Sequence, residues 1–236
     1  MLFSIDDRLS TSPFVERVWR CRSQRSGSFL SLPEGNLELV ITRLPGLRMV
    51  TLRGPVLRAS VMECPPNGEW LAIRFRIGTY LPRLLPCELA QHDHVELPTL
   101  PDGRFWLSGL SWEMPTWDNA EDFVTRLANA GVIARSHAAD AAVAGDAQWM
   151  SKRSVERHVA RSTGMALGTL QQILRVRRAV GMLVDGHSIL DATFEAGYYD
   201  QAHLTRSMKH LIGITPAELV RQSPQLSYRS ECDPSS

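Results

Sequence analysis

The segment SILDATFEAGYYDQAHLTRSMKHLIGITPAEL, residues 188–219, decides the fold class of the C-terminal half of the chain. Ser188 and Asp200 are residue types that accept backbone hydrogen bonds at helix starts, and each precedes a run with helical spacing of apolar residues. Gly197 lies between the two runs, where its conformational freedom allows a tight turn. A short helix, a glycine-containing turn and a polar helix form a helix-turn-helix layout.

The second helix of this layout has an apolar side and a polar side. Leu204 and Met208 are four residues apart, so we expect both to face the interior. The polar side carries the residues that can contact bases or phosphates: Gln201, Thr205, Arg206 and Lys209. Farther on, Thr215-Pro216-Ala217-Glu218 predicts another helix start, because Thr caps, Pro suits the first helical position and Glu closes a capping box.

A similar polar helix is predicted earlier, over 152–161. Ser151 can cap it, and Val155 and Val159 form its inward stripe. Its outward side and flanks carry the candidate DNA contacts Lys152, Arg153, Glu156, Arg157 and Arg161. A longer helix with an apolar stripe is predicted over 167–184.

The charge distribution favours a nucleic-acid partner, although the total charge does not. The 236 residues carry 26 basic and 25 acidic side chains, which gives a formal net charge of +1. Residues 1–135 have a net charge of zero, whereas residues 151–178 have a net charge of +6. The two lysines of the chain, Lys152 and Lys209, fall on the two polar helices. Basic residues gathered on helices are typical of a surface that binds phosphates.

The first part of the chain has the pattern of short strands. Turn-forming Pro, Gly and Asn residues recur, and β-branched or alternating segments such as 37–44 and 70–77 lie between them. A helix is predicted over 119–132. The expected fold class is therefore α+β, with a β-rich barrel or sandwich-like domain followed by an all-α double helix-turn-helix domain.

Residues 196–219 resemble the second helix-turn-helix of the AraC/XylS family of bacterial transcription regulators. That family has a Gly-aromatic-x-Asp run, a Leu/Phe-x-Arg helix and a Gly-x-Thr-Pro end, in the order seen here. Residues 150–184, with MSKRSVERHVARSTG and RVRRA, are similar to the family's first recognition helix and connecting helix. The resemblance implies that each unit places one helix in the major groove, in successive turns of one DNA face. It assigns base or phosphate contacts to the polar residues of both helices.

The combined pattern predicts four segments. They are a β-rich sensing or dimerisation domain over 1–117, a connecting helix over 118–135, an AraC-type double helix-turn-helix domain over 136–222 and a flexible tail over 223–236. The expected partners are double-stranded DNA, a second copy of the chain, RNA polymerase and a small-molecule effector. No cofactor is expected. No membrane partner is expected either, since no run of about 18 apolar residues occurs.

The β-rich half leaves alternatives open. Its Gly-Asn-x-Glu-Leu-Val-Ile and Ala-Ile-Arg-Phe-Arg segments resemble the N-terminal domain of some AraC-type regulators, which implies effector sensing, dimerisation or both. The alternative function is a ligand- or metal-sensing cupin-like barrel, or a cupin-like enzyme with an accessory DNA-binding domain. No GxSxG, Walker, HExxH or GxGxxG motif occurs, so we expect no enzyme and name no catalytic residue.

Two pairs of residues are candidates for ligand or metal binding in this half. Arg74 and Arg76 are positioned to bind an anionic effector, but strand alternation with Ile73 and Phe75 predicts both arginines in solvent. His92 and His94 form a His-x-His pair, which suits a metal on a strand. Neighbouring prolines indicate a loop and no third ligand is evident, so no metal is predicted.

The four cysteines, Cys21, Cys64, Cys87 and Cys232, form no CxxC or CxH pair. They are interpreted as reduced thiols, with a redox-sensing thiol as the alternative. The first ten residues include two acids where a secretory signal would have basic residues, so a cytoplasmic location is expected.

Overall fold

The computed structural model describes residues 2–84, 89, 94–222 and 226, and it divides the chain into two compact units built from interleaved segments. The first unit comprises Met1–Ser26, Asn36–Pro55 and Cys64–Leu167, and the second comprises Gly27–Gly35, Val56–Glu63 and Gly168–Ser236. The expected α+β class, with a β-rich N-terminal region followed by a helical C-terminal region, is confirmed. No helix of the described residues is long and apolar enough to cross a membrane.

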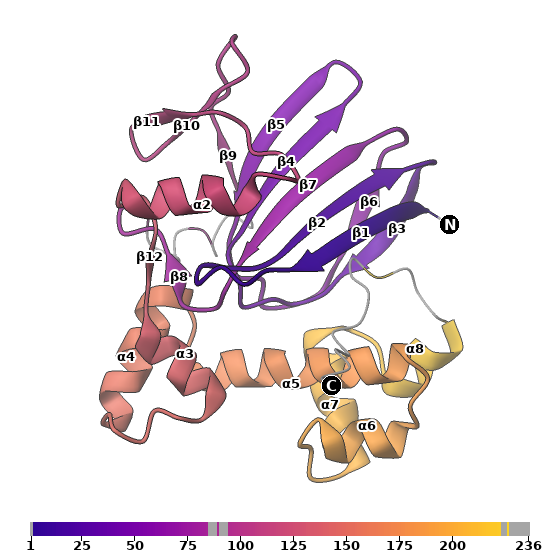
Figure 1. The fold of residues 1–236 in the computed structure, drawn as a ribbon. Helices are drawn as coiled ribbons and strands as arrows, with labels where there is room; N and C mark the ends of the chain where they lie inside the picture. The colour runs from indigo at the N-terminus through magenta and orange to yellow at the C-terminus, as the bar shows by residue number, and fades with distance from the viewer. Residues whose placement is uncertain (1, 85–88, 90–93, 223–225, 227–236) are drawn as a thin grey trace. The chain divides into compact units, whose positions relative to one another are not determined.

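The first unit is built on a six-stranded antiparallel sheet with the strand order β1-β2-β7-β4-β5-β9 (Figure 1). The strands are β1 (Phe3–Leu9), β2 (Val15–Ser23), β7 (Glu69–Phe75), β4 (Glu38–Leu44), β5 (Leu47–Arg53) and β9 (His94–Leu97). The segments 37–44 and 70–77, predicted as strands, form β4 and β7 at the centre of the sheet. Their β-branched and aromatic residues suit this buried position.

Helix α2 (Ala120–Asn129) lies across one face of this sheet (Figure 1). Phe123 and Leu127 of α2 are fully buried in the same core as Ile73 and Phe75 of β7. The amphipathic pattern that predicts a helix over 119–132 is thus satisfied by packing on the sheet.

The other described elements of the first unit are shorter. Strands β10 (Phe105–Leu107) and β11 (Leu110–Trp112) form a hairpin, and β8 (Thr79–Tyr80) pairs with β12 (Ala134–Arg135). Helices α3 (His137–Ala144) and α4 (Lys152–Thr163) follow β12.

The prediction that Arg74 faces solvent is wrong. The residue is only 4% exposed, and its Nε lies 3.5 Å from Oε1 of Glu38 on the neighbouring strand. The indole N–H of Trp19 donates to the same carboxylate oxygen at 2.7 Å. Thr42 and Thr51 on adjacent strands are also buried, so this sheet face is not the solvated one that alternation implies.

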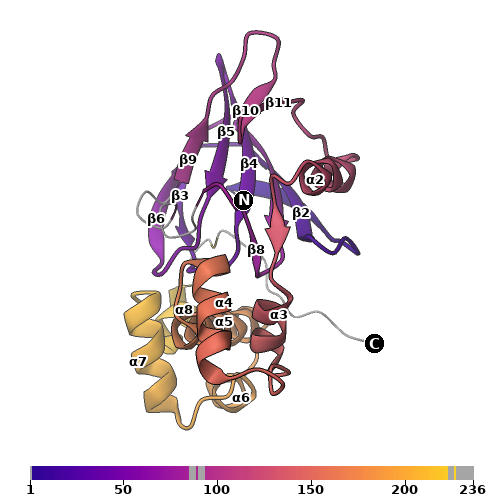
Figure 2. The same ribbon diagram turned by 90° about the vertical axis from the view of Figure 1, so that its left-hand side faces the viewer.

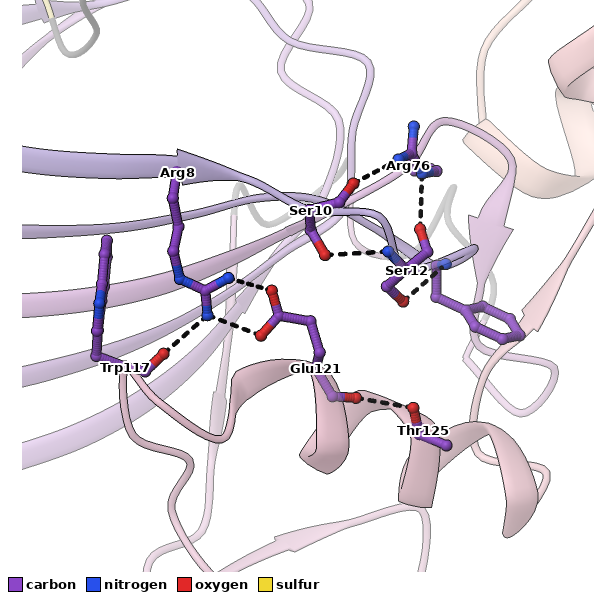
Figure 3. Close-up of polar contacts among 8 residues, drawn as sticks. Arg8, Ser10, Ser12, Arg76, Trp117, Glu121 and Thr125 are labelled. Carbon is purple, nitrogen blue, oxygen red and sulfur yellow. Dashed lines mark hydrogen bonds and ion pairs between the residues drawn. The ribbon is translucent and has the colours of Figure 1, made fainter.

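Arg76 is likewise held by the protein rather than offered to solvent. Its guanidinium donates to the backbone carbonyl oxygens of Ser10 (2.7 Å) and Ser12 (2.9 Å), in the turn between β1 and β2 (Figure 3). The guanidinium group of Arg74 therefore pairs with a carboxylate of the sheet, and that of Arg76 binds carbonyl oxygens of the turn between β1 and β2.

An ion pair fixes α2 to the edge of the sheet. The Arg8 guanidinium on β1 donates to both carboxylate oxygens of Glu121 in the first turn of α2, and also to the Trp117 carbonyl oxygen at 2.9 Å (Figure 3). The guanidinium carbons of Arg8 and Arg20 lie 5.2 and 4.7 Å from the centroid of the Trp117 ring. The hydrogen bonds from Arg8 lower the pKa of Glu121 below its usual value.

The second unit joins a two-stranded sheet to the last helices of the chain. Its strands are β3 (Gly27–Ser31) and β6 (Ser60–Cys64), and its helices are α5 (Leu167–Val184), α6 (Ile189–Glu195), α7 (Gln201–Leu211) and α8 (Pro216–Gln222). Leu32, which follows β3, is buried in one core with Val180, Leu204 and Met208 of the helices. The N–H group of Ala59 donates to the Leu211 carbonyl oxygen at 2.8 Å. Residues far apart in sequence thus complete the helical core.

Arg177 of α5 is a buried charged residue at the contact between α5 and the segment that follows β3. It is 8% exposed, and its guanidinium donates to the Pro33 carbonyl oxygen at 3.1 Å. The same nitrogen lies 3.8 Å from a carboxylate oxygen of Glu34. The buried guanidinium therefore binds the segment after β3 to the middle of α5.

We predict that Glu121→Gln lowers the free energy of unfolding at pH 7 by about 1 kcal/mol, because the bonds to Arg8 lose their negative partner. The lowered pKa means that the stabilisation is present above the ordinary carboxyl pKa and is lost as pH falls through the folded-state pKa. The wild-type advantage should thus vanish in acid, as measured by urea unfolding from pH 7 to pH 3. The exposed Glu113→Gln serves as the control; equal losses in both variants contradict the prediction.

We predict a larger loss for Arg177→Met, of about 3 kcal/mol, because it removes the charge that a buried carbonyl and carboxylate require. Thermal and urea unfolding of the full chain measure it. The neighbouring Arg178→Met changes an exposed arginine on the same helix and should stay within about 0.5 kcal/mol of wild type. Two variants of equal stability would show that the Arg177 contact contributes nothing.

Candidate nucleic-acid interface

The second helix-turn-helix, α6–turn–α7, has the start signals that the sequence predicts. The Ser188 hydroxyl accepts from the Asp191 N–H at 3.1 Å, and the Asp200 carboxylate accepts from the His203 N–H at 2.6 Å. Gly197 has a φ of 79°, the left-handed conformation that glycine adopts without strain. Local hydrogen bonds therefore define the starts of α6 and α7.

Helix α7 presents a polar side next to a fully buried stripe. Leu204 and Met208 are 0% exposed, as predicted. The candidate contacts on the other side are exposed or, for Thr205, half-buried: Gln201, Thr205, Arg206 and Lys209. The Thr205 hydroxyl donates to the Gln201 carbonyl oxygen at 2.8 Å, and Lys209 Nζ lies 3.8 Å from a Glu218 oxygen. Thr205 therefore presents acceptor lone pairs rather than its proton.

Two aromatic contacts that the sequence does not predict hold the start of α7. The Tyr198 ring meets the His203 ring edge-on, with centroids 5.1 Å apart. The guanidinium of Arg175 on α5 lies 5.5 Å from the centroid of the Tyr198 ring. The turn aromatic thus links α5 to the first turn of α7.

The predicted capping box at α8 is confirmed. The Thr215 N–H donates to a Glu218 carboxylate oxygen at 2.7 Å, and the Glu218 N–H donates to the Thr215 hydroxyl at 3.2 Å. These bonds lower the pKa of Glu218. Lys209 and α8 therefore meet at a carboxylate that the cap already holds in place.

The predicted first helix-turn-helix covers α3 and α4, which pack against each other. The Ser151 hydroxyl accepts from the Ser154 N–H at 3.3 Å, so the predicted cap of α4 is confirmed. Val155 and Val159 are buried on the inward side. The five candidate contacts on this helix are exposed: Lys152, Arg153, Glu156, Arg157 and Arg161. Gly164 ends α4 with a φ of 70°.

The metal and thiol candidates of the β-rich half lie only partly within the described residues. His94 starts β9 with an exposed side chain, and His92 lies outside the described residues. Within 2–84, 89, 94–222 and 226, no three His, Cys, Asp or Glu side chains are grouped to hold a metal ion. Burial, with a smaller effect of Cys64, raises the pKa of Cys21 to about 12, which disfavours the reactive thiolate. Cys87 and Cys232 also lie outside the described residues.

Comparison with known proteins found one family match. Residues 146–222 match a family model described as a helix-turn-helix domain, and this range contains both α4 and α7. The comparison with curated proteins found no match.

Among solved structures, ToxT from Vibrio cholerae is similar at 8% identity over 94% of this chain and 98% of that chain, with a TM-score of 0.44. ToxT from Vibrio cholerae O395 is similar at 7% identity over 93% and 97%, with a TM-score of 0.43. The unsaturated fatty acid-bound ToxT from strain SCE256 is similar at 11% identity over 92% and 94%, with a TM-score of 0.39. The family match over residues 146–222, and not these distant structural likenesses, indicates a helix-turn-helix domain.

Proposed function

We propose, on the premise that residues 146–222 form an AraC-type helix-turn-helix domain, that this DNA-binding regulator recognises a specific DNA sequence with α4 and α7. The observation that carries the proposal is the match itself, since it spans both helices and each of them has a buried stripe opposite exposed polar residues. A helix of this kind fits the major groove of B-DNA.

The two helices divide the contacts by their chemistry. On α4, Arg153 and Arg157 can donate to guanine O6 and N7, and Glu156 can accept from cytosine N4. On α7, Gln201 and Arg206 can contact base edges. The flanking residues Lys152, Arg161 and Lys209 contact phosphates in this proposal, whereas the Thr205 hydroxyl can accept a hydrogen bond from a base amino group. The two helices enter successive major grooves of one DNA face.

The remaining parts of the chain have less specific roles in the proposal. In the proposal, segment 1–117 serves for sensing or dimerisation and segment 136–222 binds DNA, in a cytoplasmic homodimer that contacts RNA polymerase. Segment 118–135 connects the two, but its helix α2 spans only Ala120–Asn129, because Ala134–Arg135 form strand β12. The proposal includes no cupin-like enzyme, because Arg74 and Arg76 bind groups of the β-rich half itself and no three potential metal ligands are grouped among the described residues.

We predict that Arg157→Ala and Arg206→Ala each weaken binding to the specific site by about 1–3 kcal/mol if the arginine reads a base pair. The site is first obtained by genome-wide footprinting, and affinities are then measured by fluorescence anisotropy at fixed salt. The loss should be greater on the specific site than on a scrambled duplex, because phosphate contacts are shared by both.

The matched control is Arg48→Ala, which removes an exposed arginine from β5 in the β-rich half. Its affinity should equal that of the wild type. If the two helix variants also bind the specific site with unchanged affinity, α4 and α7 are not the recognition elements.

A further inference from the structure

Helix α4 lies beside α3 in the first unit (Figure 2). A small cavity lies where α4 meets α3 and the β8–β12 pair. Its volume is about 240 Å³. The polar residues that line it are Tyr80 of β8, Arg135 of β12, Ser136 and His137 at the start of α3, and His158, Arg161 and Ser162 of α4. All of these elements belong to the first unit.

The lining has the chemistry of an anion site. It contains two guanidinium groups, two imidazoles and hydroxyl groups, and no acidic residue is among the lining side chains. The carboxylate of Asp140 on α3 lies 2.8 Å from a terminal nitrogen of Arg135, so it offsets the charge of Arg135 rather than that of Arg161. The start of α3 adds the partial positive charge of helix N-terminal amides.

Two buried polar atoms of the lining residues have no hydrogen-bond partner among the described residues, namely Ser136 Oγ and Arg135 Nε. Ser136 occupies the N-cap position of α3, but its side chain makes no capping hydrogen bond. Buried polar groups in folded proteins are nearly always hydrogen-bonded. Two residues that line the cavity therefore keep hydrogen-bonding capacity that the described residues do not use.

The cavity is not on the side of α4 that carries the proposed base contacts. At 100° per residue, His158 lies about 140° around the helix from Arg153, whereas Arg157 lies only about 40° from it. Helix α3 and the β8–β12 pair occupy the flank where His158 lies. The base edges that Arg153 and Arg157 contact therefore lie away from the cavity, and among its lining residues only Arg161 is also a proposed phosphate contact.

We propose that this cavity binds a small metabolite through a phosphate group, and that occupancy changes the affinity of α4 for DNA. The volume is below the roughly 300–1,000 Å³ of pockets for drug-sized ligands, so it suits one phosphate group with few further atoms. Guanidinium, imidazole, hydroxyl and helix-start amide groups together match phosphate oxygens. The binding site stands on the cavity alone, whereas the coupling rests on the proposed function and requires different anion affinities of the DNA-bound and free states.

The binding arm uses the full chain without DNA. Inorganic phosphate and glycerol phosphate are titrated at constant ionic strength by isothermal calorimetry, with succinate as a carboxylate competitor. We expect saturable one-to-one binding of the phosphate probes, about tenfold weaker in Ser136→Ala and in His158→Gln, since each removes a hydrogen bond to a charged ligand. Tyr80→Phe, which keeps the ring, is a third variant in case one of the others fails to fold.

The matched control is His187→Gln, which changes an exposed histidine in the turn before α6 and should bind the probes as wild type does. Absence of saturable binding, unchanged affinity in all cavity variants, or equally tight binding of succinate overturns the phosphate site.

The coupling arm measures DNA affinity by anisotropy with and without glycerol phosphate at constant ionic strength. The ligand should change the DNA affinity of wild type and of His187→Gln, and should do so much less in the cavity variants, whose affinity without ligand is unchanged. A ligand that binds but leaves DNA affinity unaltered overturns the coupling. A wild-type chain that binds no DNA overturns the proposed function, while the binding arm still decides the phosphate site.

Discussion

The helical region depends on the burial of Arg177. Its guanidinium is bound to the carbonyl oxygen of Pro33, 144 positions away in the chain, and lies near the carboxylate of Glu34. A charge in this position is stable only because it is paired and hydrogen-bonded. The contact places Leu32 in the helical core with Val180 and Leu204. The second helix-turn-helix is therefore completed by a segment that precedes β4, rather than by helices alone.

In the six-stranded sheet, too, charged side chains are paired with an opposite charge or hydrogen-bonded. Its α2 face is apolar and closed by Phe123 and Leu127, and Arg8 and Glu121 fix the helix at the sheet edge. Its other face buries Arg74, which is tolerated because Glu38 lies beside it. The arginines of the β-rich half thus hold strands, turns and a helix together.

The helical elements were predictable from sequence because their signals are local. Ser151, Asp200 and the pair Thr215 and Glu218 bond to backbone groups within three residues, so their spacing alone predicts where helices begin. The helix over 167–184 has the predicted bounds. The exposed side of α7 was also predictable from the sequence, because Leu204 and Met208, four residues apart, define the side that is buried.

The sequence by itself determined the α+β class, the helix-turn-helix pattern and the polar sides of α4 and α7, because these follow from residue types at fixed spacings along one element. Only the tertiary structure decided the burial of Arg74, the partners of Arg177 and the cavity formed by Tyr80, Ser136 and His158. Each of these depends on which surface covers a side chain. That surface comes from residues distant in the chain. Strand alternation and helical periodicity describe one element at a time, so they do not predict which distant residues pack against it.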